Sequence, residues 1–263
     1  MGKAVHWRRE GGVAVITLDR PAQYNVINEE LAADLREAIV GCAGDDAVRA
    51  ALLTGTGNAF CAGGDLKTFH ARVEARDVGP YFEALLPVLH SAIIQMREMT
   101  KPVVAALNGV VAGAGVGLAL ACDFRIASAR VSFHTAFLAI GASPDTSSSF
   151  FLPRYVGIGR ATEFFLRNKP VTAEEALELG LVNKVVAPEK VIDEAMALAE
   201  ELARGPTAAF GRTKQLLNAS LGSSLQDHLH SEARLITISA NSPDFAEGIS
   251  AFLAKRKPKF VGK

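Results

Sequence analysis

A chain of 263 residues, 49% of them hydrophobic, is long enough to bury one large core. Its 28 basic and 28 acidic side chains cancel, so its charge gives no reason to expect nucleic acid or an anionic membrane surface as a partner. The three cysteines have neither metal-ligand spacing nor a disulfide pattern, and the polar N-terminal segment has no apolar signal core, so we expect a cytoplasmic protein without a bound metal.

Predicted strands and helices alternate over the first half of the chain. The β-rich run 13–18 ends at a stop signal, and Asn28 is a candidate N-cap for a helix that continues to about residue 43. Apolar runs at 50–54 and 102–107 predict two more buried strands. A polar, poorly periodic stretch at 69–80 precedes a predicted helix at 81–99. This alternation favours a mainly parallel sheet with helices outside it.

Two turns rich in glycine and alanine follow the buried strands and lead into helices. They span residues 60–66 (FCAGGDL) and 108–115 (NGVVAGAG). Small residues there let a ligand approach the main chain, so that backbone N–H groups can act as donors. One N–H group from each turn, if the two converge, would form an oxyanion hole. The flanking stretch 102–122 is the most apolar, but Asn108 and several glycines interrupt it, which indicates strand, turn and helix rather than a membrane span.

The second half of the chain is predicted to be mostly helical. A Gly-Pro pair at 205–206 marks a hinge, and three helical segments then run to about residue 254. These three helical segments cannot bury all of their apolar surface against one another. We therefore expect them to pack on the core, on another subunit, or on both.

In the order and spacing of these segments the chain resembles the crotonase superfamily, that is, the enoyl-CoA hydratase/isomerase family. The matching pieces lie at 19–25, 60–66, 101–123, 152–157, 173–182 and 247–256, which together extend over nearly the whole chain. The resemblance implies an α/β fold with the ββα superhelix core of ClpP/crotonase-like proteins. It implies a core at 1–205 that holds an acyl-CoA site, and a C-terminal helical oligomerisation region at 206–263. It further implies a CoA thioester substrate, no separate cofactor, and a homotrimer or dimer of trimers.

The same resemblance implies which residues form the site. Backbone N–H groups of Gly64 and Ala114 would hold the thioester oxygen, whose charge grows when an enolate forms. Similar family tails hold the adenine and phosphates of CoA, often from a neighbouring subunit. The expected substrate-binding residues are Asn25, Val26, Ala62, Phe82, His134, Phe137, Lys259 and Phe260.

The catalytic carboxylates of a family hydratase are missing. Two glutamates hold water in such an enzyme, and by spacing they would fall at Gly117 and Phe137, neither of which can move a proton. Asp145 is the candidate replacement, because isomerases of the phenylacetate-pathway and 2,3-dehydroadipyl-CoA type, which this chain resembles, use an aspartate after this proline to move a proton between the α and γ carbons. A purely structural role for Asp145 stays open, in which Ser143 caps a helix, Pro144 begins it and Asp145 lies in its first turn.

We therefore favour an enoyl-CoA isomerase with Asp145 as the base, and three further functions stay open. The first is dehalogenation, because His90 with Asp145 resembles 4-chlorobenzoyl-CoA dehalogenase, in which an aspartate attacks the ring and a histidine activates water. The tryptophan that orients that aspartate falls here at Phe137, and His90 can equally be a pocket-lining or surface histidine. The second is hydration by an enoyl-CoA hydratase with non-standard residues, and the third is CoA-ester binding by a non-catalytic homologue.

Overall fold

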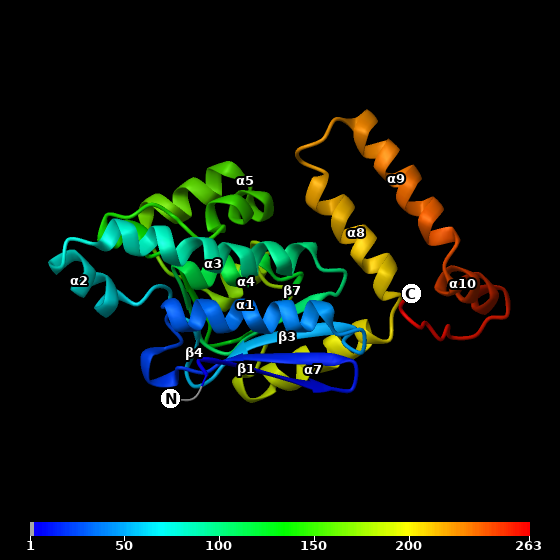
Figure 1. The fold of residues 1–263 in the computed structure, drawn as a ribbon, viewed down its shortest axis with the longest axis horizontal. Helices are drawn as coiled ribbons and strands as arrows, with labels where there is room; N and C mark the ends of the chain where they lie inside the picture. The colour runs from blue at the N-terminus through cyan, green and yellow to red at the C-terminus, as the bar shows by residue number, and fades with distance from the viewer. Residues whose placement is uncertain (1–2) are drawn as a thin grey trace.

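The computed structural model describes residues 3–263 and contains two β-sheets with helices packed on their faces (Figure 1). Met1 and Gly2, the first residues of the predicted polar N-terminus, lie outside the described residues. The larger sheet has the strand order β1-β2-β3-β5-β7-β10, and all its pairings are parallel except that of β1 with β2. Its strands are β1 (Val5–Glu10), β2 (Val13–Leu18), β3 (Ala50–Gly55), β5 (Val103–Leu107), β7 (Phe124–Ser128) and β10 (Lys184–Val186). The predicted mainly parallel sheet is confirmed.

Both faces of the larger sheet are covered, which is why its central strands are apolar throughout. Successive side chains of a strand point to opposite faces. On β3, Ala51 and Leu53 belong to the core under α1 (Glu29–Gly44) and α3 (Val78–Glu98), whereas Ala50 and Leu52 pack with α7 (Val191–Ala203). Asn28 caps α1 as predicted, because its side-chain oxygen accepts a 3.0 Å hydrogen bond from the Leu31 N–H.

The smaller sheet positions the two glycine turns. Its order is β4-β6-β8-β9, with bounds β4 (Ala59–Cys61), β6 (Val110–Ala112), β8 (Ser132–His134) and β9 (Val171–Thr172). β4 leads into α2 (Leu66–Glu74), and β6 leads into α4 (Ala114–Ala121). Since β4 and β6 are parallel neighbours, the turns that follow them leave the sheet at the same edge.

Two sequence predictions about helices are wrong. The stretch 69–80 is not irregular, because α2 ends only at Glu74 and α3 already begins at Val78. Asp65 stabilises the start of α2 by accepting from the N–H groups of Lys67 and Thr68 at 3.2 and 3.3 Å. Farther along, α5 (Ser148–Arg167) follows an N-cap at Ser147, so Ser143 caps no helix and Asp145 lies in a loop before α5. The short α6 (Ala173–Glu178) comes after β9.

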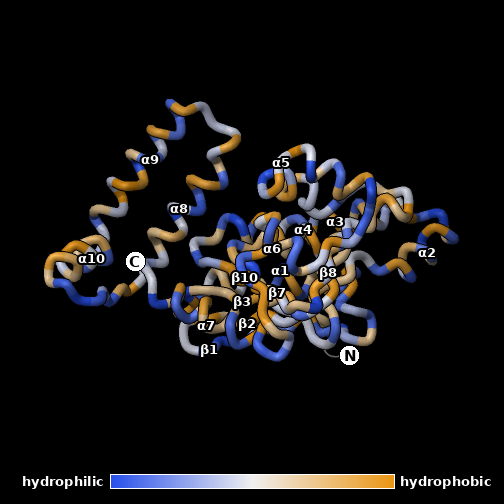
Figure 2. Tube along the Cα trace, turned by 180° about the vertical axis from the view of Figure 1, so that it is seen from behind, coloured by the Kyte–Doolittle hydropathy of each residue, from blue (hydrophilic) through white to orange (hydrophobic). Residues whose placement is uncertain are grey.

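The C-terminal helices stand beside the core, and hydrophobic residues recur along them (Figures 1 and 2). They are α8 (Thr207–Ala219), α9 (Leu225–Ala240) and α10 (Pro243–Leu253). Within residues 3–263, no helix combines the length and the apolar character needed to cross a membrane.

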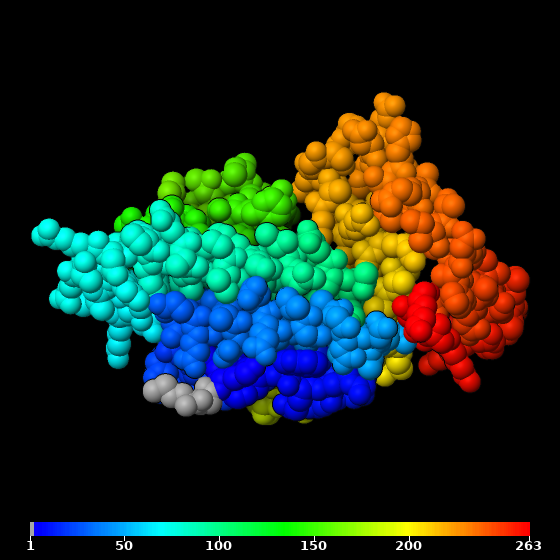
Figure 3. Space-filling model, in the orientation of Figure 1, coloured from blue at the N-terminus to red at the C-terminus, as the bar shows by residue number. Residues whose placement is uncertain are grey.

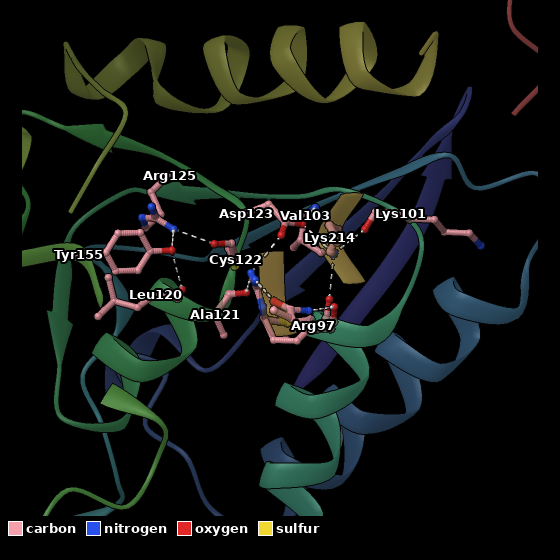
Figure 4. Close-up of polar contacts among 12 residues, drawn as sticks. Arg97, Lys101, Val103, Leu120, Ala121, Cys122, Asp123, Arg125, Tyr155 and Lys214 are labelled. Atoms are coloured by element: carbon pink, nitrogen blue, oxygen red, sulfur yellow. Dashed lines mark hydrogen bonds and ion pairs between the residues drawn. The ribbon is translucent and has the colours of Figure 1, made fainter. Parts of the chain in front are cut away.

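A buried ion pair fixes α8 to the core (Figure 4). The Lys214 ammonium lies 2.8 Å from Asp123 Oδ2 and donates to the carbonyls of Met96 and Lys101. Arg97 lies 3.0 Å from the other Asp123 oxygen. Burial lowers the pKa of Lys214, so the neighbouring carboxylate and carbonyls are what keep the ammonium charged. At least α8 therefore packs on its own core.

Candidate active site

The two glycine turns touch each other. Gly63 has φ +99° and Gly113 has φ +49°, a backbone conformation that side chains strongly disfavour. A Cβ on Gly63 would lie 3.1 Å from the Ala112 carbonyl oxygen and 3.5 Å from the Gly113 Cα. The turns therefore meet backbone to backbone, and glycine at both positions permits the approach.

The amides of Gly64 and Ala114 are among the main-chain donors that these turns leave unpaired. Neighbouring main-chain groups are engaged: Ile27 N–H donates to Gly63 O at 2.7 Å, and Gly113 N–H donates to His134 O at 2.9 Å. Within residues 3–263, the N–H groups of Gly64 and Ala114 have no acceptor. Ala114 is also the first residue of α4, where the helix dipole favours negative charge. An oxyanion hole requires such a pair of unpaired donors in adjoining turns.

An aromatic cluster covers the Gly64 turn. A Cβ on Gly64 would lie 2.6 Å from Phe69 Cε2, so the ring packs directly on the glycine backbone. The ring centroids of Phe69 and Phe82 are 4.9 Å apart, and Tyr81 lies 5.9 Å from each of them. Phe82, a predicted substrate contact, is thus part of an apolar wall beside one of the two candidate donors.

The Asp145 loop packs on the first turn of α4. An ideal Cβ on Gly117 would lie 2.7 Å from the Thr146 carbonyl carbon and closer still to its oxygen. Residues three apart on a helix share a face, so this contact places the loop on the face of α4 that begins with Ala114. The Thr146 hydroxyl donates to Asp145 Oδ1. The half-buried Asp145 therefore belongs to a loop that packs on α4.

Of the two positions that the resemblance assigns to hydratase glutamates, position 117 has no room for a side chain and position 137 is filled by a buried phenylalanine. A side chain at Gly117 would collide with the Thr146 carbonyl. Phe137 is buried, with 7% of its surface exposed, at the start of a short 3-10 turn, and its carbonyl accepts from the Ala142 N–H. These contacts explain physically why Gly117 is a glycine.

The two candidate histidines lie in different surroundings. His90, on α3, places Nε2 2.6 Å from the main-chain oxygen of Asp145, so the structure brings these two predicted residues together. His134 Nε2 lies 2.8 Å from the Ser132 hydroxyl, and its carbonyl supports Gly113. His134 therefore acts on the second glycine turn through its main chain.

The N-terminal substrate-binding candidates stabilise the first glycine turn. Asn25 is completely buried, accepts from the Arg20 N–H at 2.9 Å, and donates to two carbonyls at 3.0 and 2.8 Å. The predicted contact between the Asn25 side chain and a ligand does not fit this burial. The Val26 carbonyl accepts from the Arg20 guanidinium, and the Ala62 N–H donates to Tyr24 O at 3.0 Å.

The predicted CoA contacts in the tail lie away from the glycine turns of the same chain. The tail folds back on α10, where the Asp244 carboxylate accepts from the N–H groups of Val261 and Gly262 at 2.7 and 2.8 Å. α10 and α2 lie at opposite ends of the molecule (Figure 1). The tail, with Lys259 and Phe260, therefore lies beside α10 and not beside the Gly64 turn that precedes α2.

A large groove runs between the core and α8, beside the contact of Lys214 with Asp123. It has a volume of about 800 Å³, and side chains of α3, α5 and α8 line it, including Ile93, Phe151 and Leu217. In the space-filling view the molecule is hollowed between α5 and the C-terminal helices (Figure 3). None of the predicted site residues lines this groove. Among the residues that do line it, Ser147 is the nearest to Asp145 in the sequence.

No residues gather as a metal site, and the cysteine of the first turn is not activated. Among residues 3–263 there is no group of three His, Cys, Asp or Glu side chains that could hold a metal ion. Burial raises the pKa of the Cys61 thiol to about 12, so it is protonated at neutral pH. Sequence reasoning missed Thr146, whose hydroxyl binds the Asp145 carboxylate and whose position carries no recognisable signal.

The chain belongs to the enoyl-CoA hydratase/isomerase family, whose sequence model matches residues 8–263. It is 39% identical over 256 residues to the 1,2-epoxyphenylacetyl-CoA isomerase of Escherichia coli, covering 97% of each chain. It is 40% identical to a probable enoyl-CoA hydratase of Rhodobacter capsulatus, covering 96% of this chain and 95% of the relative.

One further relative and one solved structure are also similar to this chain. A 4-chlorobenzoyl coenzyme A dehalogenase of Arthrobacter is 34% identical, with 93% of this chain and 88% of the relative covered. A solved structure from Mycobacterium abscessus, assigned to enoyl-CoA hydratase/isomerase, superposes with a TM-score of 0.93 at 38% identity, covering 99% of this chain and 100% of that one. The crotonase fold is therefore confirmed, and the names of the relatives span more than one reaction.

Proposed function

We propose that this family member is an enoyl-CoA isomerase that moves a double bond through a thioester enolate. Asp145 would take a proton from the α-carbon of a 3-enoyl-CoA, and the electron pair would move onto the thioester oxygen. The N–H groups of Gly64 and Ala114 would stabilise that oxyanion. Asp145 would then return the proton to the γ-carbon, giving the 2-enoyl-CoA with no net change in protons and no need for a cofactor.

One observation carries this proposal. The Thr146 carbonyl occupies the space that a side chain at position 117 would need, while the Asp145 carboxylate belongs to the same loop. Hydration by two glutamates needs two groups to hold and activate water, whereas a 1,3-proton shift needs a single group that removes and returns one proton. Asp145, whose carboxylate is held by the Thr146 hydroxyl in this loop, suits the second chemistry.

The test is isomerisation of a panel of aliphatic and ring-derived 3-enoyl-CoA esters, followed as 2-enoyl-CoA formation in D₂O. Asp145→Asn keeps an acceptor for the Thr146 hydroxyl but cannot take a proton, and we expect kcat to fall by about 10²–10⁴-fold. Asp193→Asn, on the exposed side of α7, is the matched control and should keep full activity. Absence of turnover by the unaltered protein on every ester contradicts the proposal, and full activity of Asp145→Asn contradicts the assignment of the base.

The contact of His90 with Asp145 favours one second candidate, hydrolytic dehalogenation. In that reaction the Asp145 carboxylate would attack the ring carbon that carries chlorine, chloride would leave, and water would hydrolyse the resulting aryl ester. Chloride release from 4-chlorobenzoyl-CoA, together with an aryl adduct on Asp145 by mass spectrometry, would support it. Tight acyl-CoA binding without turnover in either assay would instead indicate a non-catalytic CoA-ester-binding homologue.

We also propose that the protein assembles as a homotrimer or dimer of trimers in the cytoplasm. The C-terminal helices expose large apolar side chains, among them Leu225 at 75% and Phe252 at 83% exposure, which favours burial against another copy. Sedimentation equilibrium should give the mass of three or six chains. A monomer at micromolar concentration contradicts this assembly.

A further inference from the structure

Asp145 lies in a loop that has little backbone support of its own. Between Ser143 and Ser147, no main-chain N–H group donates to an acceptor in the described part of the chain before α5 begins. A carboxylate on such a loop can move unless other elements hold it, and proton transfer requires it to stay within hydrogen-bonding reach of the substrate carbon's proton. The contacts that hold this loop therefore bear on the reaction proposed above.

One contact comes from His90. Its Nε2 lies 2.6 Å from the main-chain oxygen of Asp145, and a carbonyl oxygen can only accept a hydrogen bond. Nε2 must therefore carry a proton, whether the ring is neutral or charged. His90 is carried on α3, between the buried residues Leu89 and Ile93, so its ring projects from a rigid element.

The second contact lies on another element, α4. The Thr146 carbonyl rests against the bare Cα of Gly117, and every residue of α4 is buried. The loop thus has two successive carbonyls held, that of Asp145 by a hydrogen-bond donor on α3 and that of Thr146 by contact with a glycine on α4. The Thr146 hydroxyl then orients the carboxylate itself.

We propose that His90 is a positioning residue, whose Nε2–H holds the main chain of Asp145 so that the carboxylate meets the substrate. This inference rests on the proposed isomerase function. It differs from a role of His90 as a base, because Nε2 is engaged as a donor and only Nδ1 is left to accept a proton. A base role needs a titratable ring, whereas a positioning role needs only an N–H group at this place.

The side-chain amide of glutamine separates the two roles. His90→Gln supplies an N–H group close to the place of Nε2 and has no basic nitrogen, whereas His90→Leu fills similar space without a donor. We expect Gln to keep kcat within about 3-fold and Leu to lose about 10²-fold in kcat with KM nearly unchanged, because a displacement of about 1 Å costs that much. His230→Gln, exposed on α9, is the matched control.

Every outcome of this series decides the inference. An equal loss in His90→Gln and His90→Leu overturns it in favour of a base, and full activity of His90→Leu overturns it in favour of no role. A raised KM with unchanged kcat assigns His90 to binding and also overturns it.

A readout without activity keeps the inference separate from the proposed function. Long-range ¹⁵N–¹H NMR of ¹⁵N-histidine-labelled protein, with the His90 signals identified by their loss in His90→Gln, reports which ring nitrogens carry protons. A proton on Nε2 is expected. A ring protonated only on Nδ1 contradicts the inference, even if the protein turns over no 3-enoyl-CoA.

Discussion

Replacing Gly117 by alanine adds one methyl group where α4 meets the Asp145 loop. The change tests whether the position of that loop controls the reaction. The new Cβ would lie 2.7 Å from the Thr146 carbonyl carbon and 3.1 Å from the Ser148 nitrogen, where ordinary contact begins at 3.4 Å. The loop and the helix must therefore separate by at least 0.7 Å, which is 3.4 less 2.7, and by more at the carbonyl oxygen. The loop should yield rather than α4, because α4 is wholly buried and the loop has little backbone support.

A displacement of about 1 Å in a catalytic group costs about 10²-fold in rate, which corresponds to about 2.7 kcal/mol of activation free energy. We expect kcat for a 3-enoyl-CoA to fall by at least that factor in Gly117→Ala, while the circular dichroism spectrum and the KM stay close to those of the unaltered protein. Gly159→Ala is the control, since no atom lies within 4 Å of an ideal Cβ at that exposed position of α5. Unchanged kcat in Gly117→Ala, with the loop shown to be displaced, would refute the reasoning that the Asp145 position controls the reaction.

Three more changes test separate parts of the structure. Ala114→Pro removes one candidate donor at the first position of α4, where proline is tolerated, and should lower kcat/KM by about 10²–10³-fold with little loss of thermal stability; retention of activity would mean that this amide does not bind the oxyanion. Lys259→Ala should raise the KM for an acyl-CoA but not for the N-acetylcysteamine thioester that lacks the nucleotide, and equal effects on both would count against a phosphate contact. The three cysteines are Cys42, Cys61 and Cys122, and burial raises the pKa of each thiol from 9.0 to about 12. Iodoacetamide at pH 8 should therefore alkylate them about 10³-fold more slowly in the native than in the unfolded protein. Fast labelling of the native protein would show that the thiols are exposed.

The sequence was sufficient to predict the elements whose signal lies in neighbouring residues. The strands before the glycine turns are short apolar runs, and Asn28 precedes two glutamates in a usual capping pattern, so both were predicted as they occur. The turns were recognisable because only small residues permit their backbones to meet. The family followed from segments spread over the whole chain.

The features that the sequence did not predict depend on packing between residues far apart in the chain. Ser143 and Pro144 look like the start of a helix, but the helix begins at Ser148, because the intervening peptide rests on Gly117, which lies far back in the sequence. α2 is hidden in a polar stretch because its stabilising contacts, those of Phe69 with the Gly64 turn and with Phe82, come from tertiary structure. The contact between His90 and the Asp145 main chain spans 55 residues and has no local signature.

Isotope-edited infrared spectroscopy of a bound thioester tests the central claim directly. A non-reactive acyl-CoA analogue labelled with ¹³C at the thioester carbonyl should show its C=O stretch at lower frequency in the protein than in water, because two N–H groups polarise the bond. The shift should be smaller in Ala114→Pro. A carbonyl frequency equal to that in water, or a shift that Ala114→Pro leaves unchanged, would contradict the assignment of the Gly64 and Ala114 amides as the oxyanion hole.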